Sequence, residues 1–472
     1  MSEFGQSWYI GTHPDLAVTN VIEKEKQLIC LGPIVDTENP DQDNEMVLKR
    51  LVNAACTFEE LEKLLSPCGG RWLIFSRLRG EQRIYPDAGG TRSVFYTAHD
   101  NPQGGLWVAS QPGLMSDLLG INPMEEVVRE FTNANHDNSW PGEVTPYPGV
   151  RQLLPNHYLD MSVHRSRRFW PTSQPDPLEV NKAAAGIHQI LNGLIRGVVR
   201  RGQTAIPLTG GHDSRAVFAA AGELREAVTF FLIKDLNTRY HDILLPKRVA
   251  RTFSTAMRVI NAKPCPPSFW TSLRRNVADM LWEPGEIKMF TFGWNFPDWF
   301  VVTGSVAETG QCFYYKDGTI SEPITPQFLA KVSGYSGNAI AIQAFISWLA
   351  DMPSQSFVNP LDLFYIEHRG GNWLSMANNC FDMVCEVVPA YNCRKYFETV
   401  LGVDVAFRRK PYELFRLVCE AGAPHSSDIP FNVSTLDSVS DWFKSWVPWR
   451  VQLRYQSWRR QRAGFEYSDS IS

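Results

Sequence analysis

The sequence predicts an α/β protein whose strand-rich first part is followed by a part in which strands and helices alternate. Short β-rich runs separated by turn residues occur between about residues 72 and 110, which indicates antiparallel strands. Two later apolar runs, at 205–208 and 300–303, each lead into a turn of small residues that contains glycine. Such runs suit strands of a parallel sheet, whose ends line up along one edge and share a crevice.

The elements expected in the first part follow from local composition. Four runs combine apolar β-forming residues with flanking turns: 71–75, 83–85, 93–97 and 106–110. A helix is expected over 124–133, because Asn122 suits its cap and Pro123 its first position. The first part is therefore expected to be a string of antiparallel strands with a helix after them.

The run 205–215 is typical of a strand, a phosphate-binding loop and a helix. Its candidate binding residues are Leu208, Thr209, Gly210, Gly211, Asp213 and Ser214. Glycine has no Cβ, so the backbone of this loop can adopt positive φ and bring its N–H groups close to an anion. The carboxylate of Asp213 suits magnesium, a ribose or backbone N–H groups rather than phosphate. The arrangement favours bound ATP, although the spacing matches neither the Walker loop nor the dinucleotide pattern. The alternative is a glycine turn without a ligand.

Two further segments carry candidate residues. The strand at 300–303 runs into a turn with Gly304 and ends at the acidic Glu308, which predicts a second phosphate site or, alternatively, a strand end with an exposed acid. Asp242 stands at the start of an expected helix that follows the strand 228–232. It suits a magnesium ligand and a plain helix N-cap equally well.

The loop at 208–214 resembles the pyrophosphate loop of the PP-loop ATPases, in particular the Ser-Gly-Gly-x-Asp-Ser loop of the asparagine synthetase synthetase domain. Thr209 stands where that family usually has Ser. Those enzymes cleave ATP between the α and β phosphates, adenylate an acid and let a nitrogen nucleophile displace AMP. The resemblance therefore implies an adenylating enzyme with ATP and Mg²⁺ as cofactors.

The resemblance also implies roles for the other acids. In the family, a segment across from the first loop supplies an acid that helps to hold magnesium pyrophosphate, and Glu308 matches that acid. Val306 and Ala307 replace the glycines expected there. The implied metal ligands are Asp213, Glu308 and Asp242, and the implied catalytic residues include Asp213 and Glu308.

The first part resembles the glutaminase domain of asparagine synthetases in its order of strands and turns. The resemblance implies an Ntn-type αββα sandwich over 1–175. For 176–472 it implies a PP-loop parallel sheet, like the adenine nucleotide α-hydrolases, with a helical extension. The glutaminase nucleophile is a cysteine exposed by removal of the initiator Met. This chain has Ser2 instead, so we expect a domain that no longer releases ammonia.

An asparagine-synthetase-like domain beside an inactive glutaminase domain resembles the β-lactam synthetases and the lasso-peptide cyclases. The expected substrates are therefore a small-molecule or peptide carboxylate and an amine. Asp362, Tyr365 and Arg369 are spaced to lie near one helical face, and such residues face the acceptor pocket in asparagine-synthetase-like proteins. Arg369 is expected to bind a carboxylate or the departing phosphate, or else to pair with Asp362.

Composition sets the remaining expectations. The 472 residues favour two domains, and 44% hydrophobic with 20% charged residues is ordinary for a globular protein. A net charge of −4 predicts no bulk attraction to nucleic acid or membrane, and the sequence suggests neither a membrane span nor a signal peptide, so the cytoplasm is the expected location. Nine scattered cysteines argue against a disulfide framework. The oligomeric state is open, with a homodimer as one alternative.

Two other functions stay open. PP-loop chemistry also activates carbonyl oxygens of nucleobases, and the basic, tryptophan-containing stretch 442–462 would support a nucleic-acid-modifying enzyme. The same stretch suits an amphipathic closing helix. The altered second turn and the missing cysteine suggest, alternatively, a catalytically inactive scaffold.

Overall fold

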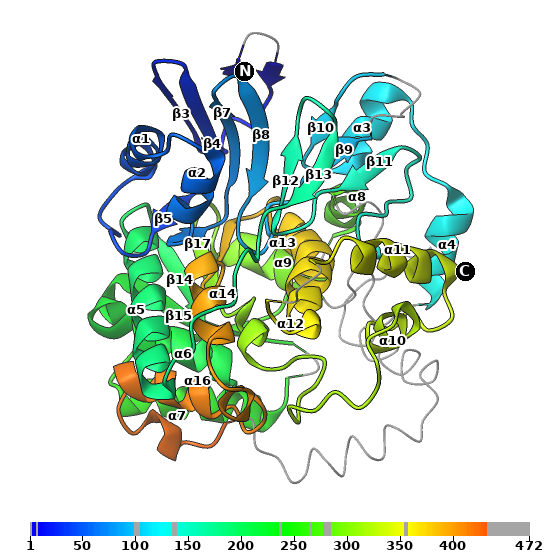
Figure 1. Ribbon diagram of the computed structural model, residues 1–472. Coiled ribbons are helices and arrows are strands. Elements are labelled where there is room, and N and C mark those ends of the chain that lie inside the picture. Colours follow the sequence, from blue (N-terminus) through cyan, green and yellow to red (C-terminus); the bar gives the residue numbers. More distant parts are fainter. Residues whose placement is uncertain are drawn as a thin grey trace.

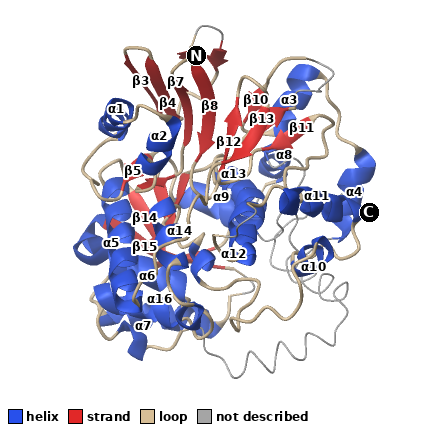
Figure 2. Ribbon diagram, viewed as in Figure 1, coloured by secondary structure: helices blue, strands red, loops and turns tan. Residues whose placement is uncertain are grey.

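The computed structural model describes residues 2–5, 8–98, 104–134, 139–235, 238–263, 266–276, 285–353 and 357–431 (Figure 1). It is a mixed α/β structure with antiparallel sheets in the first part and a parallel sheet in the second (Figure 2). The predicted fold class is therefore confirmed.

The first part is built on a six-stranded and a three-stranded antiparallel sheet. The larger sheet has the order β13 (Arg165–Arg168), β12 (His157–Asp160), β8 (Glu81–Pro86), β7 (Leu73–Leu78), β4 (Lys26–Leu31) and β3 (Val18–Glu23). The smaller sheet has the order β10 (Val108–Ala109), β9 (Phe95–Thr97) and β11 (Val150–Gln152). Two short pairs complete it: β1 (Ser2–Phe4) with β2 (Trp8–Ile10), and β5 (Ile34–Asp36) with β6 (Cys68–Gly70).

Alternating side chains arrange these sheets as the two inner layers of an αββα sandwich. On β7, Ile74 packs with residues of α1 (Asn44–Ala54) and α2 (Phe58–Leu64), whereas Phe75 packs toward the smaller sheet. On β9, Tyr96 faces the larger sheet and Phe95 packs with Met115 of α3 (Pro112–Leu119). Each sheet thus has a helix on its outer face, and the expected helix near 124–133 is α4 (Glu125–Ala134).

The second part contains a five-stranded parallel sheet. Its order is β16 (Met257–Asn261), β15 (Val228–Lys234), β14 (Thr204–Pro207), β17 (Phe300–Thr303) and β18 (Glu386–Pro389). In chain order this is 3-2-1-4-5, so the winding reverses between β14 and β17. In open parallel sheets, ligands bind beyond the carboxyl ends of the strands at such a reversal.

Helices cover both faces of the parallel sheet. On β15, Phe230 packs into the cluster that contains α5 (Val180–Val199) and α6 (His212–Ala221), while Phe231 packs against Phe292 and Phe296 near α9 (Gly285–Asn295). The remaining helices are α7 (Tyr240–Thr252), α8 (Pro267–Asn276), α10 (Pro326–Val332), α11 (Ala339–Ala350), α12 (Pro360–Phe364), α13 (Ser375–Phe381), α14 (Arg394–Leu401), α15 (Val405–Arg408) and α16 (Glu413–Gly422). Short 3₁₀ turns are Gly222–Ala227, Ala307–Gly310 and Ser426–Asp428, and Tyr365–Leu374 is a π-helix.

The two parts are joined by buried polar contacts. The fully buried Arg71 pairs with Asp382, and Arg92 donates to Glu386 at 2.7 Å. Asn392 donates to the carbonyl of Gly70 at 2.6 Å. β13 ends at Arg168 and α5 begins at Val180, and the boundary at residue 175 stays a prediction.

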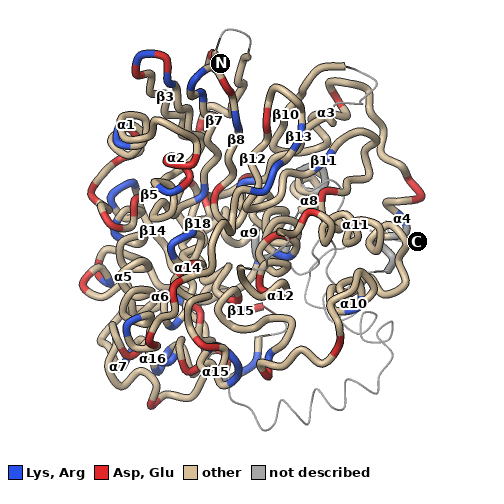
Figure 3. The backbone as a smooth tube through the Cα atoms, in the orientation of Figure 1, with Lys and Arg blue, Asp and Glu red and all other residues tan. Residues whose placement is uncertain are grey.

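Three expectations concern the chain as a whole. The eight cysteines among the described residues are all free thiols. Within the same residues, no helix is long and apolar enough to cross a membrane. Basic and acidic positions are interspersed along the described chain (Figure 3).

Candidate active site

The predicted phosphate-binding loop follows β14 and leads into α6. A ring of hydrogen bonds closes it. The backbone N–H of Thr209 donates to Ser214 Oγ at 3.0 Å, and the two hydroxyl oxygens lie 2.8 Å apart. The N–H of Gly211 in turn donates to Thr209 Oγ1 at 3.3 Å. Thr209 and Ser214 therefore fix the loop internally, and Thr209 remains exposed at its surface.

Gly210 and Gly211 could adopt positive φ, but the loop does not use this freedom. Neither is among the residues with positive φ, and Gly211 caps α6 in an extended conformation with φ −77° and ψ 166°. The hydrogen bonds of Thr209 close the loop without a left-handed residue. Because Gly211 has no side chain to accept from the first turn of α6, the N–H groups of that turn are presented to an anion.

The turn after β17 approaches the loop after β14 closely, and Gly304 makes this approach possible because it has no side chain. A Cβ added to Gly304 would lie 3.0 Å from Asp213 Cβ and 3.2 Å from the N atom of Ser214. Val306, which replaces an expected glycine, has φ 76°. A β-branched residue in this region is strained, so the turn keeps a glycine-like backbone without glycine.

These two turns bring the carboxylates of Asp213 and Glu308 together. Gln311 donates to Asp213 Oδ1, and Tyr365 donates to Glu308 Oε2 at 2.8 Å. Burial, and then the negative charge of Glu308, raise the pKa of Asp213 to about 8. The hydrogen bond from Gln311 opposes that rise in part. Two acids thus share a site whose hydrogen-bond donors to them are neutral.

Tyrosine side chains hold the backbone of both turns. Tyr391, after β18, donates to the carbonyl of Asp213 at 3.0 Å, and Tyr396 donates to that of Ala307 at 2.8 Å. Burial, followed by the charge of Glu308, raises the pKa of Tyr365 well above its usual value, so that its hydroxyl stays a donor. Neutral tyrosine hydroxyls therefore hold both the turn that contains Asp213 and the turn that contains Glu308.

Arg369 does not pair with Asp362, which was one expectation. Its guanidinium carbon lies 4.8 Å from the ring centroid of Phe313 and 4.6 Å from that of Trp373. Asp362 instead pairs with Arg408 at 2.8 Å. The segment from Tyr365 on is a π-helix, which changes the i, i+4 spacing on which the expectation rested. Arg369 still influences Tyr365, whose pKa its charge lowers in part.

The contact given by the structure for Asp242 is at the start of α7 and does not involve Asp213 or Glu308. Asp242 accepts a hydrogen bond from the backbone N–H of Arg239 at 2.9 Å and so caps α7. In the described residues, no group of three or more His, Cys, Asp or Glu side chains could hold a metal ion. The three acids expected as ligands are therefore not brought together as one cluster, and only Asp213 and Glu308 interact.

The remaining candidates lie elsewhere. Ser2 is half-buried in β1, opposite Ile10 of β2. The stretch 442–462 lies outside the described residues. Sequence reasoning missed Gln311 and Tyr396, although Gln311 follows Glu308 within one turn of chain. It also missed the buried Arg408, which stands in a basic run typical of a solvated surface.

No protein-family model and no curated protein matches this sequence. Among solved structures, one described as the structure of the allosteric regulatory enzyme of purine biosynthesis is similar over 55% of this chain and 58% of that chain. The sequence identity is 13% and the TM-score is 0.22. The alignment spans little more than half of that enzyme, and a similarity at this level assigns neither fold nor function.

Proposed function

We propose that this protein is an ATP-dependent ligase that adenylates a carboxylate and joins it to an amine, with release of AMP and pyrophosphate. The observation that carries the proposal is the pair Asp213 and Glu308 at the reversal point between β14 and β17, beside the N-terminus of α6. A helix N-terminus attracts phosphate, and a pair of carboxylates attracts a cation. Magnesium pyrophosphate combines both charges in one group.

The residues present fit a magnesium ion. Carboxylate oxygens are the ligands that Mg²⁺ prefers, and in proteins it commonly binds one or two carboxylates together with phosphate oxygens. The raised pKa of Asp213 indicates that its charged form is disfavoured in this site, so a bound cation would stabilise that form. Asp213 and Glu308 would hold the ion, which when bound would neutralise charge on the pyrophosphate leaving group.

The chain's own groups have three tasks in this proposal. The first turn of α6 and the hydroxyl of Thr209 bind phosphate oxygens by donating hydrogen bonds. Gln311 and Tyr365 orient the two carboxylates. Arg369, between two aromatic rings and only half-buried, binds the substrate carboxylate or the departing phosphate. Positioning and electrostatic stabilisation supply most of the rate enhancement.

We further propose that the nitrogen donor is an amine and not glutamine. Residue 2 is Ser where a glutaminase uses Cys, and a hydroxyl needs stronger activation than a thiol to act as a nucleophile. The αββα part would then serve as a scaffold that packs against the site-bearing part.

Release of AMP and pyrophosphate from ATP and Mg²⁺ tests the proposal across a panel of acids and amines. We expect the wild type to release both products with a responding pair, and Asp213→Asn to lower the rate about 100-fold or more. The matched control Ser2→Ala should leave the rate unchanged. A reaction that needs glutamine and Ser2 would restore an amidotransferase. No ATP binding by the wild type would support the scaffold alternative.

A further inference from the structure

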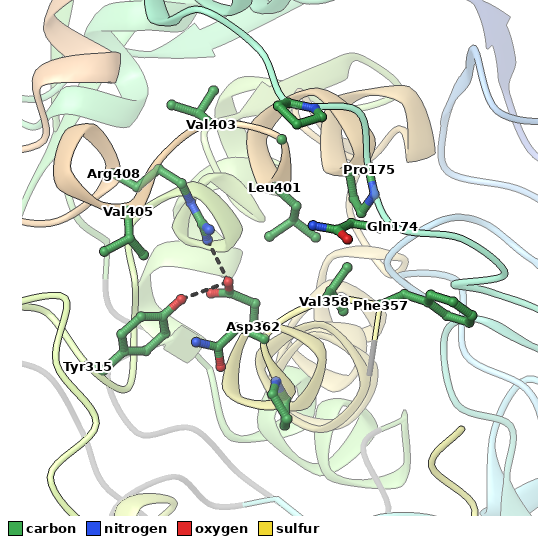
Figure 4. A pocket seen from close by; sticks show the side chains of 14 residues that line it. Gln174, Pro175, Tyr315, Phe357, Val358, Asp362, Leu401, Val403, Val405 and Arg408 are labelled. Carbon is green, nitrogen blue, oxygen red and sulfur yellow. Dashed lines mark hydrogen bonds and ion pairs between the residues drawn. The ribbon is translucent and has the colours of Figure 1, made fainter. Parts of the chain in front are cut away.

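A cavity lies apart from the carboxylate pair of Asp213 and Glu308. It has a volume of about 500 Å³ and is bounded by α12, by residues 401–405 and by the connection at 174–177 (Figure 4). Neither Asp213 nor Glu308 lines it. Its size is in the range of small-molecule sites, which is about 300–1,000 Å³.

The floor of this cavity is a buried ion pair. Arg408 Nη2 donates to Asp362 Oδ2 at 2.8 Å, and the hydroxyl of Tyr315 donates to the same oxygen at 2.7 Å. Arg408 is 3% exposed and Asp362 is 2% exposed. Figure 4 shows Arg408 and Tyr315 both pointing toward the carboxylate of Asp362.

Arg408 and Asp362 have hydrogen-bonding groups that their mutual ion pair does not use. Within the described residues, Arg408 Nε is buried without a hydrogen-bond partner. Both side-chain hydrogen bonds of Asp362 in that part of the chain go to Oδ2, which leaves Oδ1 as a further acceptor. The hydrogen bonds of Arg408 to described residues come from Nη2, so other N–H groups of its guanidinium can donate to a ligand in the cavity that it lines. Arg408 thus offers a cationic hydrogen-bond donor to the cavity, and Asp362 beside it offers an anionic acceptor.

The walls above this ion pair include the aliphatic side chains of Val358, Leu401, Val403 and Val405, together with the polar side chains of Gln174 and Asn359. An apolar wall selects a ligand body of aliphatic or aromatic character. A simple anion such as phosphate is disfavoured, because the negative charge of Asp362 in the same cavity would repel it.

We propose that this cavity binds a free α-amino acid with an apolar side chain. Its carboxylate accepts from the Arg408 guanidinium, its ammonium donates to Asp362 Oδ1, and its side chain packs among the valines and Leu401. The ligand is neutral overall, as is the ion pair it meets. The site does not depend on the proposed ligase reaction.

One contact links this cavity to the carboxylate pair. Arg408 Nη2 also donates to the carbonyl of Thr309 at 2.9 Å, and Thr309 follows Glu308 directly. On the other side, Asp362 lies one turn before Tyr365, which donates to Glu308. A ligand on Arg408 and Asp362 therefore contacts the two elements that hold Glu308.

Calorimetric titration of the full chain with L-leucine, without ATP, tests the site. L-Leucinol lacks the carboxylate and 4-methylpentanoate lacks the ammonium, so each should bind at least about tenfold more weakly than leucine. Val405→Trp fills the cavity and should abolish binding. The matched control Ala406→Trp changes the next, exposed residue of α15 and should bind as the wild type does.

Further variants separate the outcomes. Asp362→Asn with Arg408→Gln keeps hydrogen-bonding groups but removes both charges, and it should lower affinity at least about tenfold. If Val405→Trp does not fold, Leu401→Phe narrows the same cavity with less added volume. The proposal is overturned if leucine, valine and phenylalanine all fail to bind at about 10 mM. It is also overturned if binding survives the filled cavity, or if 4-methylpentanoate binds as well as leucine.

Discussion

Two acidic sites are held by the same helical segment, 360–374, and they differ in how their charge is balanced. At the first, Asp362 is paired with Arg408 and also accepts from Tyr315. At the second, Glu308 accepts from Tyr365 and faces Asp213 rather than a cation. Among the described residues, an arginine therefore pairs with Asp362, whereas Asp213 and Glu308 form no ion pair.

This difference separates an acid whose charge is balanced from two acids whose charges are not. A buried charge is usually paired, because an unpaired charge is costly to bury. The pair Asp213 and Glu308 bears that cost, which shows as the raised pKa of Asp213. Strain at Val306, in the turn between Gly304 and Glu308, adds to it. Costs of this kind cluster at sites that bind ligands.

Breaking the ion pair between Asp362 and Arg408 should give the largest change in the free energy of unfolding. Asp362→Ala leaves Arg408 buried without its counter-ion, and we expect a loss of about 3–5 kcal/mol in the free energy of unfolding, measured with urea. The exposed pair Asp41 and Arg196 is the control, since Asp41→Ala should cost less than about 1 kcal/mol. Asp362→Leu with Arg408→Met should recover most of the loss. Equal costs at both pairs would contradict the comparison.

The unbalanced site should respond to pH instead. The pKa of Asp213 is about 8 in the folded state and near 3.8 ordinarily, so between these values the folded protein binds one more proton than the unfolded chain. Stability contributed by this group therefore falls as pH rises through that window and is constant above it. Relative to Asp213→Asn, the wild type should lose up to about 1.4 kcal/mol per pH unit between pH 6 and 8.

Chemical unfolding of both proteins across this range gives the measurement. Saturating Mg²⁺ with pyrophosphate should remove the difference in pH dependence between the wild type and Asp213→Asn, because the bound cation replaces the proton on Asp213. Parallel curves for the wild type and Asp213→Asn would show that Asp213 carries no unbalanced charge.

The sequence predicted the elements of this site better than its contacts. The strands β14 and β17 were predictable because each is an apolar run that ends in a turn of small residues. Their adjacency was not, since strand order depends on where the helices between them pack. The meeting of Asp213 with Glu308 followed only from the resemblance to a known family.

Conformation and burial were harder to predict than strands. Glycine permits positive φ, yet Gly210 and Gly211 do not adopt it, whereas Val306 does although its β-branched side chain disfavours that conformation. Arg408 is one of three consecutive basic residues, and nothing local distinguishes it from its exposed neighbours Arg409 and Lys410. Asp362, distant in the sequence, decides that Arg408 is buried.

The smallest expected effect tests how the two acids come to face each other. Gly304 has no Cβ where one would lie 3.0 Å from Asp213 Cβ, so Gly304→Ala must push the second turn away from α6. We expect a loss of about 1 kcal/mol in unfolding free energy, at the lower end for overpacking. Gly11→Ala is the control, because a Cβ there meets no atom within 4 Å and its φ is not positive. Since separation weakens the repulsion from Glu308, Gly304→Ala should also flatten the fall in stability between pH 6 and 8. A destabilised variant with an unchanged pH dependence would mean that burial alone, and not the neighbouring acid, raises the pKa of Asp213.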